Sequence, residues 1–480
     1  MEPVRDHDQP CGVTALARTP GRGPLAMGRS DRAAMSKGEL AIVLHAHMPY
    51  VEGYDTWPFG EEWLWEALAC CYLPLAELLA DGAPLTLSLT PVLADQLCAP
   101  GVAERFDTFL AEVRRGTHAR DIERLPEHAG ELERAATDYE RWRASGVDLA
   151  SALPAHARWT SAATHAVLPL CATDAGVRLQ LASGIAAHRA RSERWDGGLW
   201  LPECAYAAWL EPLLAAAGVR ACCLDLTDHF GLAAPEQLRP LRSAHGPTLI
   251  PIDRATIELV WSDGGYPAHA GYRDYHHHTP NGHHAWANGG QPYDHAAALE
   301  QARADAGDFV RRVRRRVAGG GLCVAAFDAE LFGHWWYEGI AFLREVSAEA
   351  ARTGLPLVVL DDALTRHSPA ALTPRSLGVS SWGSARDLSS WDCPAAAELL
   401  FMQRSLELRL VARARTVGTA AVRELLGAMA SDWTFLAARG GAGDYPRRRV
   451  TAHARAAVEV GSPGPRNLAP FADASPLLEP

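Results

Sequence analysis

The sequence predicts an α/β fold in which a parallel β barrel is followed by a helical domain. Apolar segments of strand length alternate with amphipathic segments of helical length from residue 39 to about residue 375, which is the pattern of repeated βα units. Polar side chains that are common in catalysis follow three of the apolar segments, and parallel barrels carry their catalytic groups at the carboxyl ends of the strands. After about residue 380 only helical spacing continues.

The predicted strands are short apolar runs that end in polar or turn residues. They cover 39–47, 85–89, 199–201, 219–226, 249–252, 322–327 and 357–360. The predicted helices have apolar residues three and four apart. They cover 63–80, a charged region at about 100–150, a helix ending near residue 194, 297–317, 395–417, 420–438 and 450–458. Residues 264–291 are rich in Gly, His, Asn and Tyr, which predicts a long surface loop.

These elements divide the chain into four parts. Residues 1–37 lack apolar periodicity and are predicted to be a disordered tail. Residues 38–375 form the predicted barrel, with a helical insertion at about 100–155. Residues 376–462 form the predicted C-terminal helical domain, and residues 463–480 are a second tail.

Composition narrows the class of partner and the compartment. The chain has 480 residues, 48% of them hydrophobic, and a net charge of −11, which argues against nucleic acid or an anionic membrane as the main partner. The ten cysteines are scattered, so a reducing cytoplasm is expected. We find no apolar run of transmembrane length and no secretion signal in the first 37 residues. The oligomeric state is not predicted.

The segment from residue 324 to 339, VAAFDAELFGHWWYEG, is the most informative motif. It joins an apolar strand to Asp328, a second carboxylate, a histidine and two tryptophans. Indole rings offer flat faces to pyranose rings, and a carboxylate can supply a proton or a nucleophile. Cleavage of a sugar bond in this way needs a second carboxylate, and Glu203 in GLWLPECAY is the best candidate because it also follows an apolar segment.

Two groups of histidines in the sequence are candidates for a metal site. His45 and His47 end the first predicted strand two residues apart, which places both rings on one side. They could bind zinc, pack in the core or bind sugar hydroxyls, and we favour hydroxyls because the spacing marks no third metal ligand. His276–His278, His283 and His284 resemble a metal site in composition, but the segment lacks periodicity and is predicted to be exposed. No metal and no cofactor are expected.

Tryptophans supply further candidates for sugar contacts. Trp335 and Trp336 are adjacent and point in different directions, so at least one is expected to face a substrate. Trp382, Trp391 and Trp433 lie in the C-terminal part, where each could either pack in the core or stack on a sugar.

Several blocks in order resemble glycoside hydrolase family 57 and, within it, the 1,4-α-glucan branching enzymes. The resemblance covers about residues 39–460. Its blocks are HAHMPY at 45–50, WPFGEEW at 57–63, LTLSLTP at 85–91, AATH at 162–165, WLPECAY at 200–206, FDAELFGHWW at 327–336, SWG at 381–383 and SDW at 431–433.

The resemblance implies an incomplete (β/α)7 barrel with a helical C-terminal domain and a retaining enzyme that needs no metal. Glu203 matches the nucleophile and Asp328 the acid/base. The implied substrate is an α-1,4-glucan, amylose-like or glycogen-like, and the implied role is glycogen biosynthesis. The implied substrate-binding residues are His45, His47, Trp63, His165, His334, Trp335, Trp336, Trp382, Trp391, Asp432 and Trp433.

The chain departs from the family pattern at the periphery of the site. Ala157, Ile252, Ala268 and Gly441 replace a glutamate, an arginine, a glycine and a glutamine of the family pattern. The family also has a longer loop with a tyrosine over the site, where this chain has only 233–246, without a tyrosine. Water is thus expected to compete with sugar acceptors.

Four functions remain open on the sequence alone. A branching enzyme is the first, and a 4-α-glucanotransferase or α-amylase of the same family is the second. The altered residues around the site allow a glucan-binding protein with a decayed site. The His-x-His pair and the histidine-rich segment suggest, more weakly, a zinc-dependent polysaccharide deacetylase.

Overall fold

A computed structural model describes most of the chain. The described residues are 38–54, 60–192, 194–372, 377–459, 461 and 464–479. The predicted N-terminal tail and the predicted domain boundary near residue 375 fall outside them, as does the start of the WPFGEEW block.

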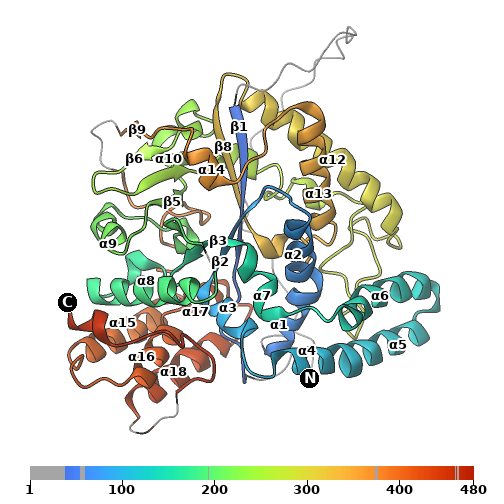
Figure 1. Cartoon of the computed structure of the whole chain (residues 1–480). Coiled ribbons are helices and arrows are strands. Elements are labelled where there is room, and N and C mark those ends of the chain that lie inside the picture. The colour runs from blue at the N-terminus through green and yellow to red at the C-terminus, as the bar shows by residue number, and fades with distance from the viewer. Residues whose placement is uncertain are drawn as a thin grey trace.

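The core of the molecule is a curled, mostly parallel sheet of nine strands (Figure 1). The strand order is β8-β1-β2-β3-β4-β5-β7-β6-β9. Every neighbouring pair from β8 to β7 is parallel, which gives the seven parallel strands of the predicted incomplete barrel. The bounds are β1 Gly38–Ala46, β2 Thr86–Leu89, β3 Ala157–Ser161, β4 Gly198–Trp200, β5 Ala221–Leu224, β6 Leu241–Arg242, β7 Thr248–Pro251, β8 Gly321–Asp328 and β9 Ala370–Ala371.

The barrel stays open between β7 and β8. No strand pairing joins β7 to β8 within the described chain, but the Asp253 N–H donates a hydrogen bond of 2.8 Å to the Val324 carbonyl. The register of β1 against β8 runs from Gly38 opposite Gly321 to His45 opposite Asp328. The carboxyl ends of β1 and β8 are therefore level with each other, which places the side chains of His45 and Asp328 at one end of the barrel.

Helices cover the outside of the sheet and build two further groups (Figure 1). The barrel helices include α1 Glu61–Ala67, α2 Leu73–Ala80, α3 Pro91–Leu97, α8 Asp174–Arg189, α9 Glu211–Ala216, α12 His295–Arg316, α13 Gly339–Thr353 and α14 Leu360–Leu364. The insertion contains α4 Val102–Thr108, the π-helical turn η2 Phe109–Arg114, α5 Arg115–Arg124, α6 Ala129–Ser145 and α7 Leu149–Ala152. The C-terminal group contains α15 Ala397–Val411, α16 Thr419–Ala428, α17 Ser431–Arg439 and α18 Tyr445–Val458.

The helical stretch Glu61–Ala80 has the length and hydropathy of a membrane span. It includes α1, the π-helical turn η1 Leu68–Tyr72 and α2. Within the described residues it is the one stretch that passes this test, and 67% of its most apolar window is buried inside the protein. That burial is the behaviour of a core helix.

Several sequence predictions about elements were wrong, and the predicted helix 420–438 is two helices, α16 and α17. Residues 357–360 do not form a strand, because Leu357 makes only an isolated bridge to Leu40 and α14 begins at Leu360. The Thr86 hydroxyl oxygen accepts a hydrogen bond from the Leu360 N–H (2.8 Å), which fixes that helix start and ends the pairing. Strand β3 was missed because its sequence, ARWTS, is not an apolar run.

Candidate active site

Glu203 lies at the carboxyl end of β4 in a strained turn. The turn η6 is Pro202–Cys204, and Glu203 has φ 62° and ψ 21° in the left-handed region. Cys204 has φ 49°, also left-handed. Non-glycine residues in this region cost about 1–3 kcal/mol each and persist where the surroundings hold them. The strain therefore aims the Glu203 side chain in a direction that an ordinary turn would not give.

Three side chains surround the Glu203 carboxylate. The Trp382 indole N–H donates to Oε2 at 2.9 Å, and the Ser431 hydroxyl donates to Oε1 at 3.3 Å. The His165 Nδ1 atom lies 3.7 Å from Oε1. The side chain keeps 17% exposure, so a ligand can still reach the carboxylate.

Burial sets the protonation of Glu203. Desolvation raises its pKa to about 7, and the nearby Asp432 carboxylate adds to the rise. The hydrogen bonds from Trp382 and Ser431 and the nearby His47 act in the opposite direction because they favour the ionised form. The group thus sits near the middle of its titration at neutral pH.

Asp328 ends β8 and has a different environment. Burial raises its pKa well above the usual range, and the neighbouring carboxylates Glu330, Glu203 and Asp432 raise it further. Such surroundings favour the protonated form of the Asp328 carboxyl. The influence of Glu203 on its pKa also places the two predicted catalytic carboxylates in one site.

Three histidines form a stacked group beside the carboxylates. His45 and His165 are joined through their Nε2 atoms at 3.0 Å, and the rings of His47 and His165 stack at 4.1 Å between centroids. The His45 ring also stacks on Trp200 at 4.9 Å. Burial holds the pKa values of His45 and His165 well below the usual range. These two rings are therefore neutral.

His47 differs because it has a carboxylate partner. Its Nε2 lies 3.1 Å from both carboxylate oxygens of Asp432, and this contact raises the His47 pKa against the opposing effect of burial. Its backbone N–H donates to Glu330 at 2.9 Å, and the Tyr72 hydroxyl donates to the same oxygen at 2.7 Å. Glu330 and Tyr72 were missed from the sequence, although Glu330 stands two residues after Asp328.

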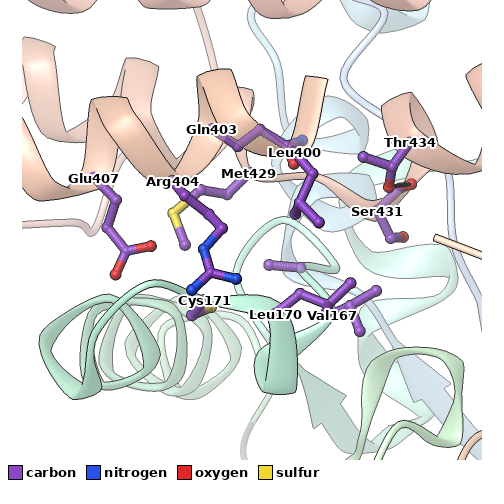
Figure 2. Close-up of a pocket in the computed structure, with 11 residues that line it drawn as sticks. Val167, Leu170, Cys171, Leu400, Gln403, Arg404, Glu407, Met429, Ser431 and Thr434 are labelled. Atoms are coloured by element: carbon purple, nitrogen blue, oxygen red, sulfur yellow. Dashed lines mark hydrogen bonds between the residues drawn. The ribbon is translucent and has the colours of Figure 1, made fainter. Parts of the chain in front are cut away.

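The C-terminal helices reach the site through a compact interface. Figure 2 shows side chains of α15 and α17 facing the barrel segment 167–171 across a cavity of about 20 Å³. Beside it, the Glu407 carboxylate accepts hydrogen bonds from the backbone N–H groups of Ala172 and Thr173, both at 2.8 Å. These groups adjoin the N-terminus of α8, where the helix dipole favours a negative charge. The interface holds Ser431 and Asp432 over the strand ends.

Two tryptophans outside the core lie near Glu203. Trp382 packs edge-on against Trp200 at 4.9 Å and against Trp261 at 5.6 Å between centroids. Trp261 is 44% exposed and was not predicted as a site residue. Its signal in the sequence was a lone tryptophan in a loop, which does not distinguish it from the others.

Three predicted sugar-binding tryptophans are core residues. Trp336 (1% exposed) packs among Phe332, Phe342 and Tyr272. Trp391 (1% exposed) lies in a buried apolar cluster, and Trp433 (0% exposed) donates its indole N–H to the Gly427 carbonyl. Their predicted contact with substrate was wrong because the rings are enclosed by protein.

The remaining predicted residues, Trp335, His334 and Trp63, have other surroundings. Trp335 is 43% exposed and packs against Tyr275 at 4.7 Å, with His334 beside it. Trp63 lies in the first turn of α1 and is half-buried against the main core. Burial lowers the pKa of His334 to about 4, and Arg114 contributes to this shift.

The histidine-rich segment is only partly exposed. His276–His278 are exposed as predicted, but His283 is buried (4% exposed) because it stacks on His118 at 3.6 Å. The prediction of an exposed run was therefore wrong for His283. Among the described residues, no group of three or more His, Cys, Asp or Glu side chains is arranged to hold a metal ion.

The fold and the paired carboxylates define a carbohydrate-active enzyme. Residues 159–376 match the family model of glycosyl hydrolase family 57, and residues 395–462 match that of the C-terminal part of 1,4-alpha-glucan branching enzymes. The chain belongs to glycosyl hydrolase family 57.

Relatives extend the similarity over most of the chain. It is 30% identical over 496 residues to the 1,4-alpha-glucan branching enzyme of Thermococcus kodakarensis, covering 87% of this chain and 72% of that protein. It is 30% identical over 503 residues to the probable 1,4-alpha-glucan branching enzyme of Mycobacterium tuberculosis, covering 88% of this chain and 91% of that protein. The crystal structure of the Thermococcus kodakaraensis family 57 branching enzyme superposes with a TM-score of 0.82 at 28% identity, covering 92% and 96% of the two chains.

Proposed function

We propose that this chain is a retaining 1,4-α-glucan branching enzyme. Glu203 attacks C1 of a glucose unit in an α-1,4-glucan, while Asp328 gives its proton to the departing glycosidic oxygen. Asp328 then takes the proton from the 6-hydroxyl of an acceptor chain, whose oxygen attacks C1 and releases Glu203. The product is an α-1,6 branch, and configuration is retained because C1 is displaced twice.

The single observation that carries this proposal is the contrast between the two carboxylates. Glu203 receives two hydrogen bonds that favour its ionised form, whereas Asp328 is surrounded by carboxylates that favour its protonated form. A nucleophile must be ionised and a general acid must be protonated. The names of the relatives supply the substrate class and the type of linkage formed.

Hydrolysis is the second candidate, and one feature of the structure favours it. The segment 233–246 contains β6, which pairs antiparallel with the first residues of β7. The Arg316 guanidinium also donates to the Ala234 carbonyl at 2.8 Å. The hairpin therefore lies at the amino end of β7, away from the carboxylates, and cannot shield the glycosyl-enzyme from water. A sugar acceptor can then compete with water only if the enzyme holds its hydroxyl close to C1 of the glycosyl-enzyme.

Incubation with amylose tests the proposed function. Proton NMR should show new α-1,6 signals, and a reducing-end assay should show an unusually large share of hydrolysis for a branching enzyme. Reducing ends without α-1,6 linkages would assign the chain to the amylases. Neither product would indicate a glucan-binding protein with a decayed site, and Glu203→Gln serves as the inactive control.

The biological setting follows as part of the same proposal. An enzyme that makes α-1,6 branches serves glycogen biosynthesis, so the expected partner is a glycogen-like glucan. We propose a cytoplasmic location, because glycogen is made there and the described cysteines are all unpaired.

A further inference from the structure

A large cavity is lined in part by Gly333 and His334, which follow Asp328 in the chain. Its volume is about 830 Å³, within the range of roughly 300–1,000 Å³ that small-molecule sites occupy. Its walls come from α1, the insertion helices α5 and α6, the histidine-rich segment, the turn 333–334 and the loop 440–443. Figure 1 shows the insertion helices projecting from the barrel on the side of α1. Neither Glu203 nor Asp328 lines this cavity.

His118 lines the cavity, and one of its ring nitrogens has no hydrogen-bond partner among the described residues. Its Nδ1 lies 3.0 Å from the Arg114 carbonyl oxygen, so Nδ1 carries the proton and Nε2 is an acceptor. The side chain is 3% exposed, and Nε2 is buried with no hydrogen-bond partner among the described residues. Burial lowers the His118 pKa to about 4, so the ring is neutral at pH 7. Buried polar atoms are nearly always hydrogen-bonded, so a donor from a bound water or from a ligand hydroxyl would satisfy this acceptor.

The neighbouring wall combines polar atoms with ring faces. The His283 Nε2 atom bonds to the Thr117 hydroxyl at 3.0 Å, and the His284 Nδ1 atom is buried without a partner among the described residues. The His284 ring stacks on Tyr275 at 5.7 Å, and Tyr275 packs against Trp335. Flat faces with hydrogen-bonding edges are the surfaces that sugar rings prefer.

The charges around the cavity do not favour an anion. The Arg114 guanidinium is paired with Glu66, and the Arg273 guanidinium lies over the Tyr337 ring at 3.8 Å. Burial and these arginines hold the pKa values of His283 and His284 well below the usual range, so both rings are neutral. A phosphate has only acceptors and would oppose the His118 lone pair, whereas a hydroxyl can donate to it.

We propose that this cavity binds the acceptor glucan chain, and before it the leaving chain, on the Asp328 side of the site. This inference rests on the proposed function. Gly333 and His334 line the cavity and follow Asp328 through the turn η10 Ala329–Leu331, whereas the side chains that hold Glu203 do not line it, Ser431 and Trp382 included. The side of the acid/base is the side where the leaving oxygen departs and the acceptor oxygen arrives.

Binding of maltopentaose to the inactive Glu203→Gln enzyme tests the site without turnover. Adding His118→Leu removes the acceptor atom and should weaken binding about tenfold by titration calorimetry, because an unpaired partner is left buried. His284→Phe keeps the stack on Tyr275 and should weaken binding about threefold. His245→Leu, on the exposed β6–β7 turn, is the matched control and should bind as the parent does. If both His118→Leu and His284→Phe bind maltopentaose as the parent does, the proposed glucan site in this cavity is wrong.

A second measurement tests whether the cavity binds the acceptor chain or the donor chain. In the background with Glu203 intact, α-maltosyl fluoride forms the glycosyl-enzyme without a leaving chain. His118→Leu and His284→Phe should leave the first-turnover burst of fluoride release unchanged and lower transfer to maltopentaose by about tenfold and threefold. Equal losses in both steps would overturn the acceptor assignment. If wild-type enzyme makes no α-1,6 linkages while maltopentaose affinity still falls, the glucan site stands and the branching function fails.

Discussion

Glu203 and Asp328 occupy equivalent places in the barrel but opposite environments. Both follow parallel strands, β4 and β8, at the same end of the sheet. Glu203 has a left-handed backbone and two hydrogen-bond donors on its carboxylate, whereas Asp328 has an extended backbone (φ −63°, ψ 131°) and lies among carboxylates. The comparison shows how one site can favour the ionised form of one carboxyl and the protonated form of another.

The environments come from different parts of the chain. The donors on Glu203 belong to Trp382 and to Ser431, far along the chain from β4. The carboxylates around Asp328 include Glu330 in its own turn. Burial is the largest influence on the pKa of both carboxyls, while Trp382 and Ser431 favour the ionised form of Glu203 and Glu330 favours the protonated form of Asp328.

Removing either carboxyl should have the largest effect. Glu203→Gln and Asp328→Asn are each expected to lower kcat by at least about 10³-fold, and the double variant by little more, because residues that act as a unit are not additive. Steady-state rates on amylose measure this, with circular dichroism to show that each variant is folded. Near-normal activity in either folded single variant would remove that residue from the chemistry.

The pH profile should separate the two environments. Activity needs ionised Glu203, so kcat/KM should fall as pH drops through about 7. Trp382→Phe removes a donor that lowers the Glu203 pKa, and the acidic limb should therefore move to higher pH. A hydrogen bond to a charged group contributes about 1.5 kcal/mol, which corresponds to about one pH unit.

Trp261→Phe is the matched control for that shift. Trp261 packs against Trp382, and the described contacts of Glu203 do not include it. The acidic limb of the pH profile of Trp261→Phe should lie at the same pH as that of the wild-type enzyme. A limb that moves equally in both variants would show that general repacking, not the hydrogen bond, sets the pKa.

The sequence predicted the barrel better than it predicted the surroundings of the site. Strands β1 and β8 were found because nearly all their residues are apolar and buried, so the pattern needs no knowledge of neighbours. Strand β3 was missed because its polar residues are satisfied by the fold, as when the Ser161 hydroxyl donates to the Trp200 carbonyl.

The catalytic pair was predictable, but its partners were not. Glu203 and Asp328 follow apolar runs, which marks strand ends in any barrel. A tryptophan carries no sequence mark of the direction in which it points, so Trp336 and Trp433 were assigned to the substrate although both are enclosed. The cavity wall formed by His118 and His283 joins residues far apart in the sequence, and only the fold brings them together.

The interface under the C-terminal helices should have a smaller effect than the carboxylates. Gly176 lies in α8, and a methyl group there would collide with the Glu407 carboxylate. Gly176→Ala should lower the free energy of unfolding by about 2 kcal/mol and reduce kcat several-fold, because Ser431 and Asp432 would shift. Denaturant unfolding and amylose assays measure the two effects.

Gly130→Ala provides the comparison for that substitution. Gly130 lies in the first turn of α6, and a methyl group added there would meet nothing within 4 Å. The change should therefore be neutral or stabilise the protein by up to about 1 kcal/mol. A similar loss of stability in Gly176→Ala and Gly130→Ala would show that the collision with Glu407 is not the cause of the loss.

Metal removal should have no effect. The proposed reaction needs no cation, because the Asp328 proton neutralises the negative charge that develops on the leaving oxygen. Prolonged chelation followed by dialysis should leave the amylose rate within about twofold of the untreated rate. Full loss that zinc restores would favour the deacetylase alternative.

Azide rescue tests the central claim, that Glu203 is the nucleophile and Asp328 the acid/base. With α-maltosyl fluoride as donor, Glu203→Ala leaves room for azide to displace fluoride directly, and the expected product is β-maltosyl azide. Asp328→Ala still forms the glycosyl-enzyme because fluoride departs without a proton, and azide then displaces Glu203 to give α-maltosyl azide. Proton NMR distinguishes the two anomers. The opposite pairing of variant and anomer, or the same anomer from both variants, would contradict the assignment.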